Sequence, residues 1–149
     1  MWKTETAIDI AAPVETVYDY LADFSRHPEW STGVSELAPV GNGPVAVGTE
    51  LKAVEEVPAR FTSHTRITAL EPPRRIAWES WVGRTAKVKW AFEISAQNGR
   101  THLVQRAHVQ PTSLLGRLLL AAMRKRQIPK ENAASLARIK ANLEKRNSK

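Results

Sequence analysis

Cysteine is absent from the chain, so disulfide bonds and thiolate chemistry are both excluded. No apolar run approaches the roughly 20 residues that a membrane-spanning helix needs. The N-terminus reads MWKTET and lacks the basic and apolar segments of a secretory signal peptide. We therefore expect a soluble, cytoplasmic protein. Its 149 residues suit a single domain, 1–149, that buries most of its apolar surface.

Several catalytic motifs are missing as well. The sequence contains no G-x-S-x-G, no H-E-x-x-H and no Walker-type loop. Gly41-Asn42-Gly43 follows no convincing strand and opens no helix, so it is not a dinucleotide fingerprint. His102 and His108 are separated by roughly 20 Å along a strand, which is too far to share a metal ion. We predict neither a metal site nor a cofactor.

The positive charge is concentrated near the C-terminal end. Residues 117–149 hold ten Lys or Arg and two Glu, whereas the rest of the chain holds 12 basic and 13 acidic residues. A basic helix can contact an anionic membrane surface or nucleic acid. No aromatic residue is interleaved among these charges for base stacking, so a nucleic-acid partner is not expected. A solvated outer helix face is the simplest interpretation, and peripheral membrane contact stays open.

The stretch from Pro111 to Lys149 has a helical composition and two apolar stripes. At 100° per residue the stripes are displaced by roughly 90°, so a straight helix would not keep both on one core. Pro129 lacks an N–H and its ring clashes with the carbonyl of Lys125, which predicts a bend or break within 125–129. We expect one long, bent, amphipathic C-terminal helix. The first stripe consists of Leu115, Leu118, Leu119, Ala122 and Met123, and the second of Ala133, Leu136, Ile139 and Leu143.

The N-terminal part predicts a strand followed by two short helices. Apolar and polar residues alternate over 2–11, as in a half-buried strand. Pro13 suits the first turn of a helix. A second short turn contains His27 and Trp30. We expect His27 at the surface, although it could rim the mouth of a ligand cavity. The apolar positions of the first helix, at i, i+3, i+4 and i+7, are Val14, Val17, Tyr18 and Leu21.

From Thr49 to Val109 the sequence predicts a meander of five strands, whose registers follow from the turns. Asn98-Gly99 is the strongest hairpin signal, because a tight hairpin turn favours these two residues. A two-residue loop there predicts the pairs Ile94–Leu103, Phe92–Gln105, Trp90–Ala107 and Val88–Val109. A three-residue turn at 83–85 predicts the pairs Ser80–Val88 and Trp78–Trp90.

Two further connections set the remaining registers. An even-length connection at Pro72-Pro73 predicts the pairs Ala69–Ile76 and Thr65–Ser80. A three-residue turn at 58–60 predicts the pairs Leu51–Ile67 and Glu55–Ser63. A slip by one residue would turn every side chain to the other face, so the hydrophobic pattern selects these registers. His64, Arg66, His102 and His108 then face outward.

The inward face of this sheet is uneven. One cross-strand row, Ala53–Thr65–Ser80–Val88–Val109, is small or hydroxylated, and the next row holds Trp78 and Trp90. A helix cannot fill such a surface flush, which predicts an apolar-lined cavity, although the large side chains could instead fill the core. The predicted cavity residues are Trp30, Leu51, Ala53, Glu55, Ser63, Thr65, Trp78, Ser80, Val88, Trp90, Gln105, Leu115, Leu119 and Met123.

Glu55 is the one ionisable residue among the inward positions predicted for the sheet. Burial would raise the pKa of its carboxyl and suit it to proton transfer. A carboxylate near a hairpin end could equally reach solvent or Arg60 and have no role in catalysis. Glu55 is therefore a candidate acid/base residue, and we assign no catalytic residue.

The order of segments resembles the START/polyketide cyclase–dehydrase-like (SRPBCC, helix-grip) superfamily over nearly the whole chain. A first strand, AAPVETVYDYLADFSRHPEW, VGTELK, EPPRRIAW, a W-x-F strand, NGRTHLV and a long C-terminal helix carry the resemblance. It implies an α+β helix-grip fold: a curved, seven-stranded antiparallel sheet wrapped around the C-terminal helix, with two short helices after the first strand. It also implies a lipid, sterol, quinone or polyketide held between sheet and helix, and in some members cyclisation or dehydration. It implies no shared catalytic motif.

Three functions are compatible with these observations. A carrier or sensor of a hydrophobic small molecule needs only the cavity, and we favour it over an enzyme. A polyketide cyclase or dehydratase with Glu55 as acid/base needs a convergent polar pair, for which the candidate partners are Ser63 and Gln105. A module that contacts membrane or RNA needs an exposed basic C-terminal helix without a large cavity.

Overall fold

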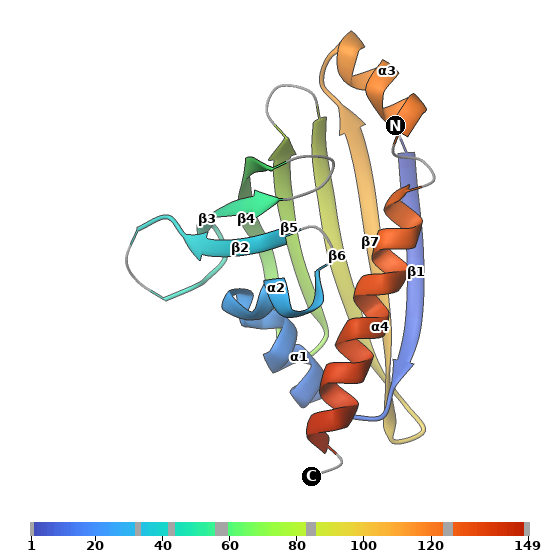
Figure 1. The fold of residues 1–149 in the computed structure, drawn as a ribbon. Coiled ribbons are helices and arrows are strands. Elements are labelled where there is room, and N and C mark those ends of the chain that lie inside the picture. Colours follow the sequence, from blue (N-terminus) through green and yellow to red (C-terminus); the bar gives the residue numbers. More distant parts are fainter. Residues whose placement is uncertain are drawn as a thin grey trace.

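The computed structural model describes residues 2–31, 34–41, 44–55, 60–82, 86–123 and 127–147 (Figure 1). Within them the chain forms seven strands and five helices. In chain order these are β1 (Trp2–Ile10), α1 (Val14–Ala22), the 3-10 helix η1 (Phe24–Arg26), α2 (His27–Trp30), β2 (Val34–Pro39), β3 (Glu50–Glu55), β4 (Phe61–Glu71), β5 (Arg75–Val82), β6 (Ala86–Gln97), β7 (Arg100–Pro111), α3 (Leu114–Met123) and α4 (Gln127–Asn147).

All seven strands belong to one antiparallel sheet, ordered β1-β7-β6-β5-β4-β3-β2. Strands β2 to β7 follow one another as a meander. The last strand, β7, also pairs with the first strand, β1, which forms one edge of the sheet. Figure 1 shows α4 running beside β1 and β7, with α1 and α2 beside its C-terminal half. The predicted helix-grip architecture is confirmed: a curved seven-stranded sheet, short helices after the first strand and a C-terminal helix.

The predicted registers of two hairpins are confirmed. Ile94 lies opposite Leu103, and the other three pairs expected between β6 and β7 are also present. The turn between these strands has positive φ at Asn98 (52°) and Gly99 (79°), as a tight hairpin turn requires. Trp78 lies opposite Trp90, as the three-residue connection between β5 and β6 predicts.

Two other registers differ from the prediction. Thr65 pairs with Ser80 as expected, but a bulge at Thr68 moves Ala69 opposite Ala77 rather than Ile76. Between β3 and β4 the pairing is displaced by two residues. Leu51 faces Thr65 instead of Ile67, and Glu55 faces Phe61 instead of Ser63. A two-residue displacement keeps every side chain on its face, so the hydrophobic pattern could not detect it.

The core lies between the inner face of the sheet and the helices α1, α2 and α4. Alternate strand residues supply one side, and the buried faces of the helices supply the other, as the alternation of side chains along a strand requires. The fully buried large side chains are Ile10, Val17, Leu21, Leu51, Ile67, Ile76, Phe92, Leu103, Val109, Leu136, Ile139 and Leu143.

Polar contacts fasten α4 to the end of β1. The backbone N–H of Ala11 donates to Glu144 Oε2 at 2.9 Å. Lys140 Nζ donates to the same carboxylate at 2.6 Å and to the carbonyl oxygen of Asp9 at 2.8 Å. Farther along, Asn142 Nδ2 donates to the hydroxyl of Tyr20 in α1 at 3.0 Å. These bonds fix the orientation of α4 across the sheet.

The C-terminal region contains two helices, α3 and the longer α4, on either side of the segment where a bend or break is predicted. Helix α3 ends at Met123 and α4 begins at Gln127, while residues 124–126 lie outside the described part of the chain. Pro129 falls in the first turn of α4, where its missing N–H leaves no internal hydrogen bond unmade. The chain thus separates into two helices where the sequence predicts a bend or break.

Leu115 and Leu118 of the apolar stripe predicted on α3 do not pack on the sheet. Leu114, Leu115 and Leu118 are 74%, 61% and 63% exposed. On α4, Ala133 is exposed, while Asn132 and Ser135 are buried together with the three predicted large residues. The side chains of Leu119, Ala122 and Met123 lie outside the described ones.

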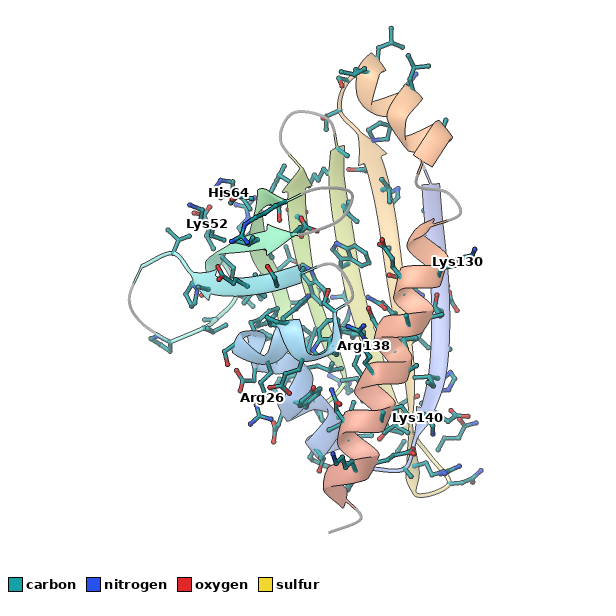
Figure 2. All side chains as sticks on the ribbon, viewed as in Figure 1. Arg26, Lys52, His64, Lys130, Arg138 and Lys140 are labelled. Atoms are coloured by element: carbon teal, nitrogen blue, oxygen red, sulfur yellow. The ribbon has the colours of Figure 1, made fainter. Side chains whose placement is uncertain are left out.

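The outer face of the sheet is solvated, as predicted. Figure 2 shows Lys52 and His64 together on this side of β3 and β4, and both are exposed. Arg106 of β7 forms ion pairs with Glu5 and with Glu93. Exposed pairs of this kind contribute little to stability, so the folding energy comes from the inner face.

Candidate functional site

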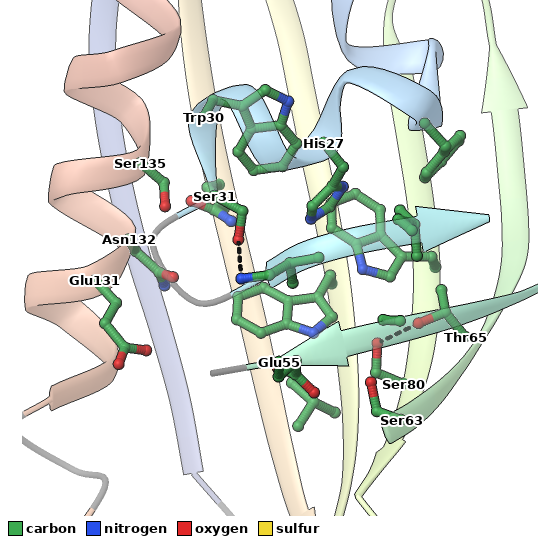
Figure 3. Close-up of a pocket in the computed structure, with 18 residues that line it drawn as sticks. His27, Trp30, Ser31, Glu55, Ser63, Thr65, Ser80, Glu131, Asn132 and Ser135 are labelled. Carbon is green, nitrogen blue, oxygen red and sulfur yellow. Dashed lines mark hydrogen bonds between the residues drawn. The ribbon is translucent and has the colours of Figure 1, made fainter. Parts of the chain in front are cut away.

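The candidate site is a cavity of about 100 Å³ between the inner face of the sheet and the N-terminal part of α4 (Figure 3). Strands β2 to β7 all contribute side chains, and η1 and α2 close one end. The residues that line it are Phe24, His27, Trp30, Ser31, Val34, Leu37, Ala53, Glu55, Ser63, Thr65, Trp78, Ser80, Val88, Trp90, Gln105, Glu131, Asn132 and Ser135.

Aromatic rings form one wall of the cavity. The rings of Trp78 and Trp90 are stacked, with centroids 6.3 Å apart and planes at 16°. They are neighbours because the register between β5 and β6 places the two residues directly opposite each other. Phe24 meets Trp78 edge-on at 6.0 Å. This wall offers a ligand flat, apolar contact surface.

Hydroxyl groups line another part of the cavity. Thr65 Oγ1 and Ser80 Oγ are 3.0 Å apart and share a hydrogen bond across β4 and β5 (Figure 3). Ser63 is also buried, two residues before Thr65 on the same strand face. The predicted row of small side chains is present at Thr65, Ser80 and Val88. In β3 the residue opposite Thr65 is Leu51 rather than the predicted Ala53, because the register between β3 and β4 differs by two residues.

Helix α4 presents polar side chains to the cavity. Glu131, Asn132 and Ser135, none of which the sequence predicts there, line it (Figure 3). Asn132 precedes Leu136 by four residues and Ser135 precedes Ile139 by four, so both belong to the helix face that carries the buried stripe. A polar residue inside an otherwise apolar stripe was the signal that sequence reasoning missed.

His27 is buried against the aromatic wall, and the prediction of a surface role is wrong. Its ring centroid lies 4.1 Å from that of Trp30 and 5.7 Å from that of Trp78. Burial without a charged partner lowers the pKa of His27 from 6.5 to about 3. The imidazole is therefore neutral at physiological pH.

Two carboxylates and no Lys or Arg are present among the lining residues that the structure describes. Glu55, at the end of β3, and Glu131, in the first part of α4, are both half-buried. The predicted partnership of Glu55 with Ser63 does not take the form of a cross-strand pair, since Ser63 faces Ala53. Both residues nevertheless line the same cavity.

Ten of the fourteen predicted cavity residues line the cavity. Leu51 is fully buried in the core and contributes no lining surface. Leu115 is 61% exposed on α3, so its predicted place in the cavity is wrong. The structure does not describe the side chains of Leu119 and Met123. The ten are Trp30, Ala53, Glu55, Ser63, Thr65, Trp78, Ser80, Val88, Trp90 and Gln105.

No group of three or more His, Asp or Glu that could hold a metal ion occurs in the described residues. His102 Nδ1 lies 2.8 Å from Asp9 Oδ1 on the outer side of the sheet. His108 faces outward on the same strand. Desolvation, with Lys3 and Lys89 nearby, lowers the pKa of His108.

The curved sheet, α4 and the cavity between them give the helix-grip fold. A model of the family described as "Polyketide cyclase / dehydrase and lipid transport" matches residues 1–144. The chain belongs to this family, as its segment order indicates. No protein of curated function matches the sequence. None of the described helices is both long and apolar enough to span a bilayer.

Solved structures with the same fold come from several organisms. The Zhui aromatase/cyclase from Streptomyces sp. R1128 has a TM-score of 0.79 and 17% identity, over 97% of this chain and 94% of that one. A START superfamily protein from Mycobacterium smegmatis has a TM-score of 0.73 and 16% identity, over 96% and 97%. The norcoclaurine synthase from Thalictrum flavum has a TM-score of 0.73 and 11% identity, over 98% and 96%. At these identities the likeness establishes the fold alone.

Proposed function

We propose that the protein binds a hydrophobic small molecule, such as a lipid, a sterol, a quinone or a polyketide-like compound, between the sheet and α4. The observation that carries this proposal is that three tryptophans, Trp30, Trp78 and Trp90, line one cavity on the inner face of the sheet. Small-molecule sites combine such apolar and aromatic surface with a few placed polar groups. The family description, which includes lipid transport, supports the same function. A cytoplasmic location stays a prediction of the sequence.

The size of the cavity limits what it can hold in this conformation. Its volume of about 100 Å³ is below the roughly 300–1,000 Å³ typical of drug-sized ligand pockets. We therefore expect a ring or a short chain to enter first, and a whole sterol to require movement of the lining side chains. The stacked indoles of Trp78 and Trp90 suit a flat ring best.

Native mass spectrometry of gently purified protein tests this function directly, and a co-purified small molecule is the expected result. Ser63→Leu, which fills the cavity, should displace that molecule and any fluorescent lipid analogue. The adjacent Thr62→Leu is a matched control, because Thr62 is exposed and faces the other way. Absence of any bound mass, together with no change in Trp emission on adding such probes, would contradict the proposal.

The second candidate function is that of a polyketide cyclase or dehydratase, with Glu55 as the acid/base residue. Glu55 lines the cavity, as such a role requires. Its carboxylate would take a proton from a carbon next to a carbonyl, and the resulting carboxylic acid would protonate a departing hydroxyl as water. Glu55→Gln should then abolish turnover while leaving binding intact. Glu50→Gln, on the same strand but exposed, should leave turnover unchanged, and equal turnover in both variants would exclude Glu55.

The third candidate function is contact with an anionic membrane through the C-terminal region. The exposed leucines of α3 are followed in the sequence by Arg124-Lys125-Arg126. Apolar residues beside basic ones are typical of a helix that lies in a membrane interface. Sedimentation with phosphatidylserine-containing vesicles should retain the wild type but not Leu115→Ser/Leu118→Ser. Equal recovery of both proteins with these vesicles would end this candidate.

A further inference from the structure

Three residues that line the cavity each carry a buried polar atom with no hydrogen-bond partner among the described residues. The atoms are Trp30 Nε1, Gln105 Oε1 and Asn132 Nδ2. The three side chains are only 2%, 3% and 3% exposed. Buried polar groups of native proteins are nearly always paired, so three such atoms around one cavity require an explanation.

The three atoms come from separate elements that converge on the same space. Trp30 belongs to α2, Gln105 to β7 and Asn132 to α4. Phe92 connects the first two, since its ring lies 5.5 Å from that of Trp30 and its residue pairs directly with Gln105. Figure 3 shows the Asn132 side chain extending from α4 toward the cavity and the Trp30 ring at the α2 end, with the indole nitrogen on the ring edge away from Asn132. The tertiary fold, rather than any local turn, brings these groups together.

The chemistry of the three atoms specifies complementary groups on a ligand. An indole N–H only donates, and the amide nitrogen of Asn132 also donates, whereas the side-chain oxygen of Gln105 accepts. A ligand carbonyl oxygen can accept a hydrogen bond from the indole N–H or from the amide of Asn132. A ligand hydroxyl can satisfy the acceptor. An unsubstituted hydrocarbon would leave all three atoms unpaired, which disfavours it.

The charge of the lining restricts the ligand further. Glu55 and Glu131 are the ionisable acids at the cavity, and no Lys or Arg lines it among the described residues. His27 is held neutral by burial. A carboxylate or phosphate would therefore meet two acidic side chains and, among the described lining residues, no Lys or Arg that could neutralise it. Burial of an anion without such a partner is strongly unfavourable.

We propose that Trp30, Gln105 and Asn132 form a polar recognition triad that selects a neutral ligand bearing a carbonyl and a hydroxyl group on a flat apolar body. This inference rests on the proposed function, because it names the ligand chemistry of that same cavity. The triad supplies selectivity, and the stacked Trp78 and Trp90 supply contact area. Free fatty acids and other anionic lipids are excluded as ligands of the cavity.

Binding of three single-ring probes tests the proposal by NMR at pH 6.5. The probes are 4-hydroxyacetophenone, which has both groups, 4-ethyltoluene, which has neither, and the anion 4-ethylbenzoate. We expect the hydroxyketone to bind and to move the indole N–H resonance of Trp30 downfield, with that resonance identified by its loss in Trp30→Phe. The anion should bind at least about tenfold more weakly than the hydroxyketone, which corresponds to one well-made hydrogen bond or more.

Two variants separate recognition from packing. Asn132→Leu and Gln105→Leu should each weaken binding of 4-hydroxyacetophenone by roughly fivefold to tenfold and leave 4-ethyltoluene binding unchanged or tighter. Their melting temperatures should stay the same or rise, because each substitution removes an unpaired buried polar group. The matched control is Asn142→Leu on the same helix. Asn142 is bonded to Tyr20, so this variant should lose stability and keep its affinity for the probe.

The outcomes distinguish this inference from the proposed function. If all three probes bind equally well, and the two variants bind them as the wild type does, the cavity still holds small molecules but the triad has no role. Tighter binding of 4-ethylbenzoate than of the hydroxyketone would also overturn the triad alone. If no probe binds and no ligand co-purifies, the proposed function itself fails.

Discussion

The two C-terminal helices reverse what their compositions suggest. Helix α3 reads LLGRLLLAAM and is almost entirely apolar, yet three of its leucines are exposed. Helix α4 carries many charges, yet it buries Leu136, Ile139 and Leu143 in the core. Ser113 caps α3 by accepting the N–H of Gly116 at 3.0 Å, so the start of α3 is well formed even though Leu114, Leu115 and Leu118 are exposed.

The contrast between α3 and α4 shows what determines whether a helix is buried on the sheet. A narrow apolar stripe that faces the sheet matters more than the overall hydrophobicity of the helix. Helix α4 has its large residues at 136, 139 and 143, which share one face. Its charged residues occupy the remaining surface, and Figure 2 shows Lys130 and Arg138 on opposite sides of α4 in that view. Helix α3 follows directly on β7 and extends beyond the sheet, so its leucines have no inner face to cover (Figure 1).

The largest effect should come from the buried stripe of α4. Ile139→Ala removes a side chain that is fully buried between α4 and the sheet. We expect a loss of about 2–5 kcal/mol in the free energy of unfolding, because truncation leaves a cavity in addition to the lost transfer energy. Urea unfolding followed by Trp fluorescence measures it. A loss below about 1 kcal/mol would show that α4 is held mainly by its polar contacts.

Acid should lower the free energy of unfolding through the buried His27. Burial lowers the pKa of His27 from 6.5 to about 3, so below pH 6.5 the unfolded chain takes up a proton that the folded protein does not. Stability from this residue is complete above pH 6.5 and falls by about 1.4 kcal/mol per pH unit as the pH drops toward 3. Urea unfolding at several pH values should show a flatter dependence for His27→Phe. Parallel curves for both proteins would contradict the assignment.

The polar attachment of α4 to β1 should have a smaller, pH-dependent effect. Bonds from Lys140 and from the backbone of Ala11 lower the pKa of Glu144. A carboxyl with a lowered folded pKa stabilises above its unfolded pKa, and this contribution disappears as the pH falls through the folded value. Glu144→Gln should cost about 1 kcal/mol at pH 7 and nothing in strong acid. The control is Glu50→Gln at an exposed position of β3, which should change the free energy of unfolding at pH 7 by no more than about 0.5 kcal/mol.

The smallest effect should come from α3, despite its composition. Leu118→Ala removes a large apolar side chain that is 63% exposed, so the free energy of unfolding should change by no more than about 0.5 kcal/mol. The same urea experiment measures it beside Ile139→Ala. A loss of 2 kcal/mol or more, as expected for a buried leucine, would show that α3 packs on the fold in solution and would remove the contrast between the two helices.

Much of the sheet could be predicted from the sequence because alternation and turn chemistry are local. The hairpin at Asn98-Gly99 set its whole register, and the Trp78–Trp90 pair followed from the next turn. The connection between β3 and β4 carries no comparable signal. The observed register between β3 and β4 differs from the predicted one by two residues, which does not change which side chains face inward. The prediction therefore still placed Ala53, Ser63 and Thr65 on the inner face.

The helical side of the site could not be predicted in the same way. Leu115 was expected in the cavity because it is apolar, and Asn132 was overlooked because it is polar. His27 was assigned to the surface because it precedes Pro28 in a polar turn. In each case the side chain's own chemistry was a poor guide, since burial depended on what the rest of the chain placed beside it.

The sequence by itself determined the α+β class, the inner and outer faces of the strands, the hairpin at Asn98-Gly99 and the presence of a packing stripe after Pro129. These features depend on residue spacing and on backbone preferences that act within a few residues. Only the tertiary structure decided that α4 rather than α3 covers the sheet, and that Trp30, Gln105 and Asn132 meet around one cavity. Such contacts join residues far apart in the chain, and the shape of the assembled sheet selects which helix face can reach it.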